Sequence, residues 1–146
     1  MVKLQSTEDW VTSLDREFEK IYLFKGVNNM SLSSIFKINA VFAAMWGIQL
    51  VFVPNMVFAQ YGWEATTPLL SIAEACGTAM GSLAIISWMT PTWTSEDGLK
   101  KAALWFSVTA VLFVIMQIHL FQGRITDYVS TAVTALFAIG FYMKSR

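Results

Sequence analysis

Polar and ionisable side chains interrupt the long apolar stretches of this 146-residue chain. Glu74 is the most informative of them, because it lies about two helical turns, or roughly 10 Å, inside the second apolar stretch. A carboxyl group at that depth is costly unless it is paired, protonated or next to a wet cavity. Glu74 is therefore the first candidate for a functional site.

Other polar residues are expected at a similar depth, near the same end of their helices: Gln49, Gln117, His119, Ser130, Thr131 and Thr134. Two interpretations of this polar layer are open. In the first, Glu74 is neutral and donates to a carbonyl or to Gln117, and the layer only sets helix register; such contacts average about 0.6 kcal/mol. In the second, the layer binds a lipid head group, a pigment, a quinone or a proton.

Chlorophyll-like pigments are compatible with the sequence, because each needs only one axial ligand. That ligand could come from His119, Gln117, Gln49, Asn39 or a water held by Glu74. Aromatic residues make up 14% of the chain and could pack against macrocycles and carotenoids, although aromatic residues that face lipid explain the same fraction. A bound pigment or a bound lipid is thus the cofactor expectation.

Several other chemistries are excluded by composition. The single cysteine, Cys76, cannot close an intramolecular disulfide, and the single histidine, His119, cannot form a bis-His haem site or a histidine cluster for metal. Ten basic and ten acidic residues leave no net charge, which argues against nucleic-acid binding. A lipid-modifying enzyme that pairs Glu74 with His119 stays an alternative, although no third residue is there to orient the pair.

Four apolar stretches must position these residues. The chain is 55% apolar and 14% charged, and a helix needs about 20 mostly apolar residues to span a membrane. The stretches that qualify are Phe36–Phe58, Pro68–Met89, Ala102–Phe121 and Ile125–Met143. We expect an all-α integral membrane four-helix bundle over residues 34–146, preceded by a separate N-terminal segment, residues 1–33. Thr67 is expected to cap the second helix and Thr90-Pro91 to end it.

Basic residues predict the orientation of this bundle. Nine fall on the side of the two termini, and only Arg124 falls on the other: Lys3, Arg16, Lys20, Lys25, Lys37, Lys100, Lys101, Lys144 and Arg146. The positive-inside rule then places both ends on the cytoplasmic side, or on the stromal or matrix side of an organelle membrane. A thylakoid or mitochondrial inner membrane fits this expectation.

The N-terminal segment is predicted to hold an amphipathic helix. Trp10, Leu14, Phe18 and Ile21 recur at helical spacing and make one apolar face. The segment from Glu8 to Lys20 contains five acidic and two basic residues. Helices that lie on anionic lipid are instead rich in Lys and Arg. This face is therefore expected to dock on protein rather than on lipid.

Small residues at four-residue spacing mark a second contact surface. They are Gly77 and Gly81 in the second stretch, extended upstream by Ala73, and more weakly Asn39, Ala43 and Gly47 in the first. Such faces let helix backbones approach closely. Their partner is expected to be another helix of this bundle by default, with a helix of another chain as the alternative.

Two segments carry a resemblance to a known group of proteins. They are the stretch from Lys37-Ile-Asn-Ala-Val-Phe42 to Tyr61-Gly-Trp63, and Ser71-Ile-Ala-Glu-Ala-Cys-Gly-Thr-Ala-Met-Gly81. Over residues 35–143 the chain resembles the small four-helix membrane proteins of the DoxX-like and related groups. The resemblance implies a four-helix bundle and no common reaction. Some of these relatives look like scaffolds that tether other membrane proteins.

These observations lead to a functional hypothesis. The acidic N-terminal helix, the small-residue face and the lack of a catalytic set favour a non-enzymatic accessory or scaffold subunit of a larger membrane complex, in a photosynthetic or respiratory assembly. The expected partners are other membrane subunits and the lipid bilayer. The alternative is a module that binds or transports a small lipophile or a proton through the layer around Glu74.

Overall fold

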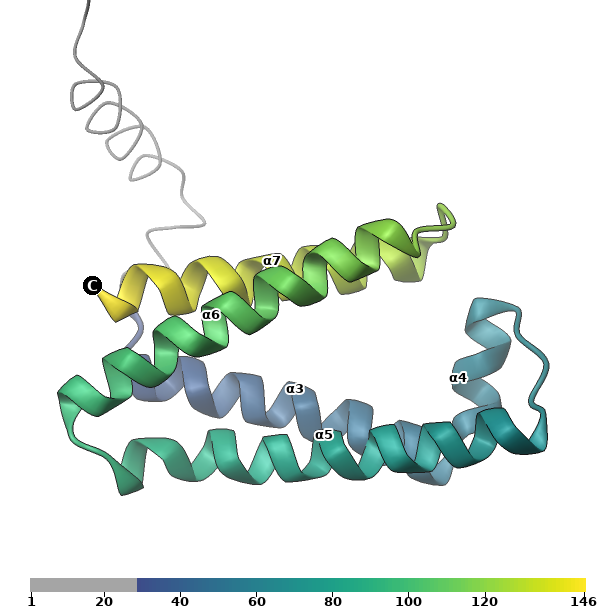
Figure 1. Cartoon of the computed structure of the whole chain (residues 1–146), viewed down its shortest axis with the longest axis horizontal. Coiled ribbons are helices and arrows are strands. Elements are labelled where there is room, and N and C mark those ends of the chain that lie inside the picture. Colours follow the sequence, from purple (N-terminus) through teal and green to yellow (C-terminus); the bar gives the residue numbers. More distant parts are fainter. Residues whose placement is uncertain (1–28) are drawn as a thin grey trace, which may run out of the picture. The chain divides into compact units, whose positions relative to one another are not determined.

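Four long helices and one short helix make up residues 32–146 of this computed structural model, which describes residues 29–146 (Figure 1). They are α3 (Leu32–Phe52), α4 (Pro54–Tyr61), α5 (Thr67–Trp93), α6 (Glu96–His119) and α7 (Ile125–Ser145). All five belong to one unit, Leu32–Arg146. The described part is all-helical, as the sequence predicts.

The four long helices are α3, α5, α6 and α7. Each is long and apolar enough to cross a membrane. Helices satisfy their own backbone hydrogen bonds, which is what a segment in hydrocarbon requires. The chain therefore has the architecture of a multi-pass helical membrane protein.

The first apolar stretch differs from its prediction, because it forms two helices. Val53 leaves the helical conformation (φ −136°, ψ 45°), and Pro54 begins α4 in the first turn, where its missing N–H costs no hydrogen bond. Gly62 ends α4 with a left-handed φ of +64°, and its N–H donates to the carbonyl of Ala59. The stretch Phe36–Phe58 is thus a spanning helix followed by a short helix that takes a new direction.

The ends of the second helix also differ from the prediction. Its N-cap is Thr66 rather than Thr67, and the helix continues through Pro91 to Trp93. The missing N–H of Pro91 removes only the backbone hydrogen bond to the Ser87 carbonyl, close to the end of the helix. Here Thr90 donates to the carbonyl of Ile86, and Thr92 donates to that of Met89.

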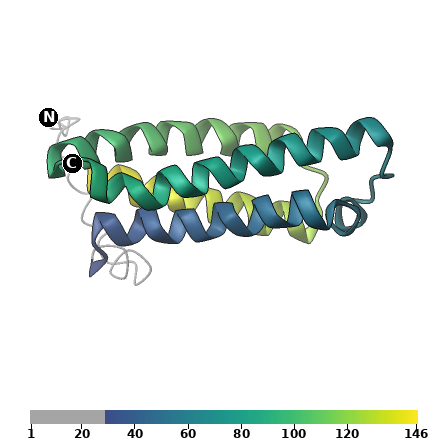
Figure 2. The ribbon, with the colours of Figure 1, turned by 90° about the horizontal axis from the view of Figure 1, so that it is seen from below.

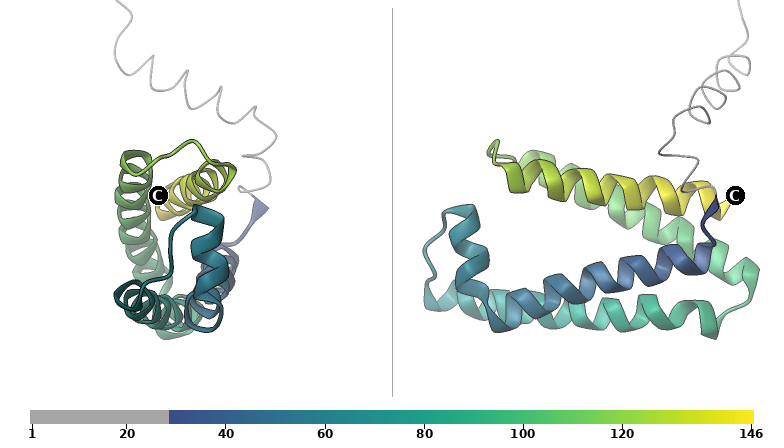
Figure 3. Two further views of the ribbon diagram at one scale, coloured as in Figure 1. Left: turned by 90° about the vertical axis from the view of Figure 1, so that its right-hand side faces the viewer. Right: turned by 180° about the vertical axis from the view of Figure 1, so that it is seen from behind.

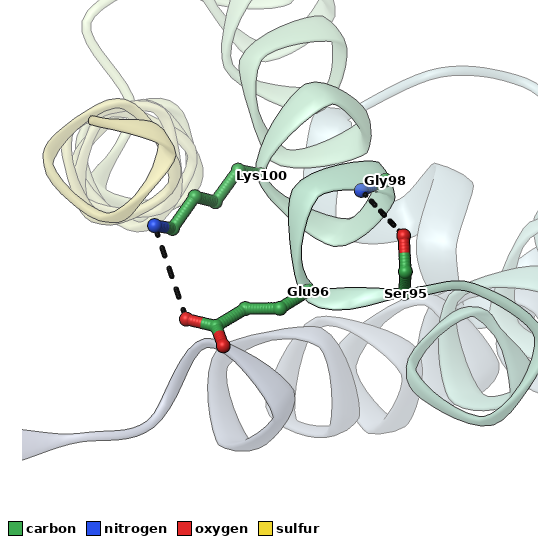
Figure 4. Close-up of polar contacts among 4 residues, drawn as sticks. All are labelled: Ser95, Glu96, Gly98 and Lys100. Carbon is green, nitrogen blue, oxygen red and sulfur yellow. Dashed lines mark hydrogen bonds and ion pairs between the residues drawn. The ribbon is translucent and has the colours of Figure 1, made fainter.

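Helix α6 begins directly after this end (Figure 4). The Ser95 hydroxyl accepts a hydrogen bond from the Gly98 N–H at 3.3 Å, which caps the helix. Glu96 and Lys100 lie one turn apart and form an exposed ion pair at 3.8 Å. The connection between α5 and α6 therefore consists of Thr94 and Ser95.

The helices pack as two antiparallel pairs, α3 with α5 and α6 with α7. The pairs approach each other near the α5–α6 connection and diverge toward α4 (Figures 1 and 3). Small residues explain the close approach of the first pair. A Cβ atom added to Gly77 would lie 2.6 Å from Val51 Cγ2 and 2.9 Å from the Gly47 carbonyl oxygen.

Aromatic rings join the two pairs at the end where they meet. Phe36 of α3 is completely buried, and its ring centroid lies 5.1 Å from that of Phe106 and 4.8 Å from that of Phe141. Further along, Phe42 of α3 contacts Phe137 of α7 at 5.8 Å. Beyond Phe42 these ring contacts stop, and the pairs move apart.

Candidate binding cavity

A cavity of about 330 Å³ lies between α3, α4 and α7, on the α4 side of the Phe42–Phe137 contact. Five apolar residues line it: Phe42, Met45, Trp46, Ile125 and Val129. Five uncharged polar residues complete the lining: Gln49, Gln60, Tyr61, Thr126 and Ser130. Its volume is within the range of sites for small organic ligands.

Antiparallel packing of α3 and α7 orders this lining by depth. Helix α3 runs toward α4, so Phe42 lies deepest on its side and Gln49 lies about 10 Å nearer the helix end, at 1.5 Å per residue. Helix α7 runs the other way, which places Thr126 near the mouth and Ser130 one turn deeper. The deep part of the cavity is thus lined by apolar residues of α3 and by the Ser130 hydroxyl, and its rim is lined by polar residues together with Ile125.

Helix α4 closes the outer end of this space. Figure 2 looks along α4, which stands across the direction of α3. Its C-terminal residue Tyr61 lines the cavity, and the turn after it contacts α7, because the Arg124 guanidinium lies 3.2 Å from where a Cβ atom of Gly62 would be. The kink at Pro54 therefore brings Gln60 and Tyr61 over the cavity.

Tyr61 is held as a neutral phenol at the rim. Burial raises its pKa above the ordinary 10.0, and the negative charge of Asp127 raises it further. Asp127 is itself fixed, because its carboxylate accepts hydrogen bonds from the backbone N–H groups of Gln122 and Arg124. The phenol is therefore a hydrogen-bond donor at any physiological pH.

Polar groups with open hydrogen-bonding capacity lie at the cavity. The Gln117 amide of α6 donates to the Ser130 hydroxyl at 2.6 Å, which joins α6 to the cavity wall. Among the described residues, the Gln117 Oε1, Thr126 Oγ1 and Thr131 Oγ1 atoms are buried without a hydrogen-bond partner. Of these three residues only Thr126 lines the cavity. Since a buried polar group without a partner costs free energy, the Thr126 hydroxyl favours a polar group close by.

The structure divides the predicted polar layer. Gln49 lines the cavity and Gln117 contacts it through Ser130, so Gln117 pairs with Ser130 and not with Glu74 as one interpretation expected. Glu74 and His119 are both exposed on the surface of their helices and do not line it. Asn39 lies at the other end of α3, where its amide donates to the Ser87 hydroxyl at 3.1 Å.

Ser87 connects α5 to α3. It is fully buried and donates to the Phe36 carbonyl at 3.0 Å while it accepts from Asn39. Asn39 is therefore used by a contact inside the bundle, about 15 Å along α3 from Gln49 at 1.5 Å per residue. This position separates Asn39 from the other residues suggested as ligands.

The residues suggested for partner binding lie in different surroundings. Gly77 is buried against α3, so this chain's own helix fills the face that another chain could have used. Gly81 has open space where its Cβ would be. The four positions of the N-terminal amphipathic face lie outside the described residues: Trp10, Leu14, Phe18 and Ile21.

Sequence reasoning missed several cavity residues, among them Trp46, Gln60, Tyr61 and Thr126. The predicted helix Phe36–Phe58 leaves Tyr61 outside the expected spanning segments. Pro54 was the signal that could have found it, because proline at the start of a second helix allows the chain to turn back over the cavity.

Comparisons with known proteins add no assignment to this geometry. No family model, no curated protein and no solved structure matches the chain. The resemblance to DoxX-like proteins therefore stays a prediction. Within residues 29–146, no group of three or more His, Cys, Asp or Glu side chains is placed to hold a metal ion.

Proposed function

We propose that this protein is a non-enzymatic accessory or scaffold subunit of a larger membrane assembly. The supporting observation is how little of its helices the described chain covers. Between 11% and 28% of the residues in the apolar window of each spanning helix are buried, and α6 has the lowest share. Helix association in lipid depends on close packing, so the uncovered faces are available to other membrane helices.

Helix α6 presents the clearest of these faces. Trp105 is 70% exposed, Leu112 is 62% exposed and Met116 is 48% exposed. Their spacing of seven and four residues places them on one side of the helix. This stripe of α6 is our proposed contact with a neighbouring subunit, and the acidic N-terminal helix predicted from sequence is a second contact.

The proposal includes an orientation. Three basic residues, Lys37, Lys144 and Arg146, lie near the start of α3 and the end of α7. Among the described residues, Arg124 is the only basic residue at the opposite end of the bundle. With the positive-inside rule, this distribution supports cytoplasmic, stromal or matrix termini and places α4 and the cavity on the opposite side. A photosynthetic or respiratory membrane stays the predicted host, with pigment or lipid as the predicted cofactor.

Site-specific photo-crosslinking in native membranes tests the subunit proposal. A photoreactive amino acid at Leu112 should give one discrete protein adduct, and the same substitution at Ile85, an equally exposed residue of α5, should give only lipid adducts. Deletion of residues 1–25 should weaken co-purification of the same partner. Lipid adducts alone at both positions, together with unchanged co-purification, would contradict the proposal.

One alternative function has a specific observation in its favour. The cavity below α4 supports a module that binds a small lipophile, although its residues are Gln49, Tyr61, Thr126 and Ser130 and not the predicted centre Glu74. Replacement of Glu74 by Gln should then leave ligand binding unchanged. A proton-binding module or a lipid-modifying enzyme centred on Glu74 and His119 would instead lose its activity in this variant.

A further inference from the structure

In the cavity between α3, α4 and α7, the α3 and α4 sides separate apolar from polar groups along the helix direction. Helix α7 instead contributes one apolar and one polar residue at each level, Ile125 with Thr126 at the rim and Val129 with Ser130 one turn deeper. Phe42, Met45 and Trp46 form the deep part, and Gln49, Tyr61 and Thr126 lie toward the end of the helices. An amphiphile in a bilayer has the same arrangement, with its chain in the hydrocarbon and its head group toward the interface. The apolar deep part of the cavity therefore suits the chain of an amphiphile, and its outer part suits the head group.

The lining favours an uncharged head group. Every polar residue that lines the cavity is a neutral amide, phenol or hydroxyl. Two charged residues next to the rim lie outside the lining: the Asp127 carboxylate accepts from two backbone N–H groups, and the Arg124 guanidinium lies beside Gly62. A buried charge needs a partner of opposite sign, whereas the rim offers hydrogen bonds: the phenol donates, the amides donate and accept, and Thr126 Oγ1 is buried without a partner.

The cavity is open toward the bilayer. Met45 is 51% exposed and Val129 is 58% exposed, although both line it. A volume of about 330 Å³ accommodates a glycerol-sized head group with the first part of a chain. The rest of that chain can leave between these two residues and lie in the surrounding lipid.

We infer that this cavity binds a single-chain neutral amphiphile, with a hydroxyl or ester head group hydrogen-bonded to Tyr61, Thr126 and Gln49 and an alkyl chain over Trp46. This site goes beyond the subunit role, because it needs no partner protein. Its occupant comes from the lipid of the membrane itself.

Fluorescence quenching of Trp46 measures this binding directly. The full chain is placed in phosphatidylcholine nanodiscs with a monoacylglycerol that carries bromine atoms on its chain. The emission of Trp46 is isolated by subtracting the signal of the Trp46→Phe variant, because five other tryptophans contribute. We expect quenching that saturates at a low mole fraction, whereas brominated phosphatidylcholine should quench in proportion to its amount.

Two conservative variants test the role of the rim. Thr126→Val and Tyr61→Phe each remove one hydroxyl, and each should raise the mole fraction for half-quenching about three- to tenfold, the effect of one net hydrogen bond. Thr109→Val is the matched control, because Thr109 is an exposed threonine of α6 that donates to the Trp105 carbonyl. It should leave the curve unchanged.

The head group is tested with a lysophosphatidic acid that carries the same brominated chain. We expect much weaker saturable quenching from this charged analogue. Equal quenching by both amphiphiles would overturn the assignment of a neutral ligand. Quenching that never saturates in the wild type, or curves that both rim variants leave unchanged, would overturn the site.

Discussion

The close contact between α3 and α5 at Gly77 allows a sharp prediction for Gly77→Ala. The added methyl group would lie 2.6 Å from Val51 Cγ2 and 2.9 Å from the Gly47 carbonyl oxygen, and that oxygen belongs to backbone that cannot rotate away. Overpacking of this kind costs about 1–3 kcal/mol. Replacement of glycine by alanine inside a helix also stabilises the helix by about 1 kcal/mol. The free energy of unfolding should therefore fall by up to about 2 kcal/mol in total.

Gly81→Ala is the matched control, one turn further along the same helix. No atom lies within 4 Å of its added methyl group, so this variant should gain the helix propensity without the clash. The propensity term is the same for both variants and cancels, which leaves a difference of about 1–3 kcal/mol in the free energy of unfolding. Equilibrium unfolding by sodium dodecyl sulfate in mixed micelles, followed by circular dichroism, measures it. Equal stability of the two variants would refute the packing of α5 against α3 at Gly77.

The remaining predictions concern the two ends of the bundle. Phe36→Ala should lower the free energy of unfolding by about 3 kcal/mol, because Phe36 is fully buried where the helix pairs meet. A loss below about 1 kcal/mol would show that the contacts of Phe36 with Phe106 and Phe141 do not join the pairs. Ser87→Ala should cost about 1 kcal/mol through its lost hydrogen bond to α3, whereas Ser82→Ala, which loses only a bond within α5, should be near neutral; the same unfolding assay compares them. In an absorbance titration of tyrosinate, the Tyr61 pKa should lie above 10.0 and should fall in Asp127→Asn. Because the folded state raises this pKa, the Tyr61 contribution to stability is complete below pH 10 and is lost as the pH rises through the raised value; a Tyr61 pKa at or below 10.0 would contradict the burial of the phenol at the cavity rim.

The helices of this protein could be predicted from sequence because membrane spans depend on length and composition. Four apolar stretches predicted four spanning helices, and all four are present. Their ends were less accurate at the prolines. Pro54 and Pro91 look alike as sequence signals, yet Pro54 begins a new helix and Pro91 continues an old one. Val53 leaves the helical conformation before Pro54, with φ −136° and ψ 45°, whereas α5 stays helical through Pro91, and this difference in backbone conformation is seen only in the folded chain.

The candidate site was predicted only in part, because depth along a helix does not fix the direction of a side chain. Gln49, Gln117 and Ser130 were expected at one level, and the structure brings them to one cavity. Glu74 was expected among them, and it faces outward. Ala73 and Gly77 belong to the buried face of α5, and Glu74 follows Ala73 by one residue, about 100° around the helix, so the rotation of α5 turns Glu74 away from that face. This rotation depends on the tertiary packing.

Gentle extraction of the chain from its native membrane, with sizing of the particle and mass spectrometry of its contents, tests most directly whether the protein is a subunit. An absorption spectrum recorded on the same particle shows whether pigment or haem accompanies it. We expect a particle far larger than the 16.4 kDa chain, with other membrane proteins in fixed ratio. A small particle that contains only this chain and lipid would contradict the subunit role.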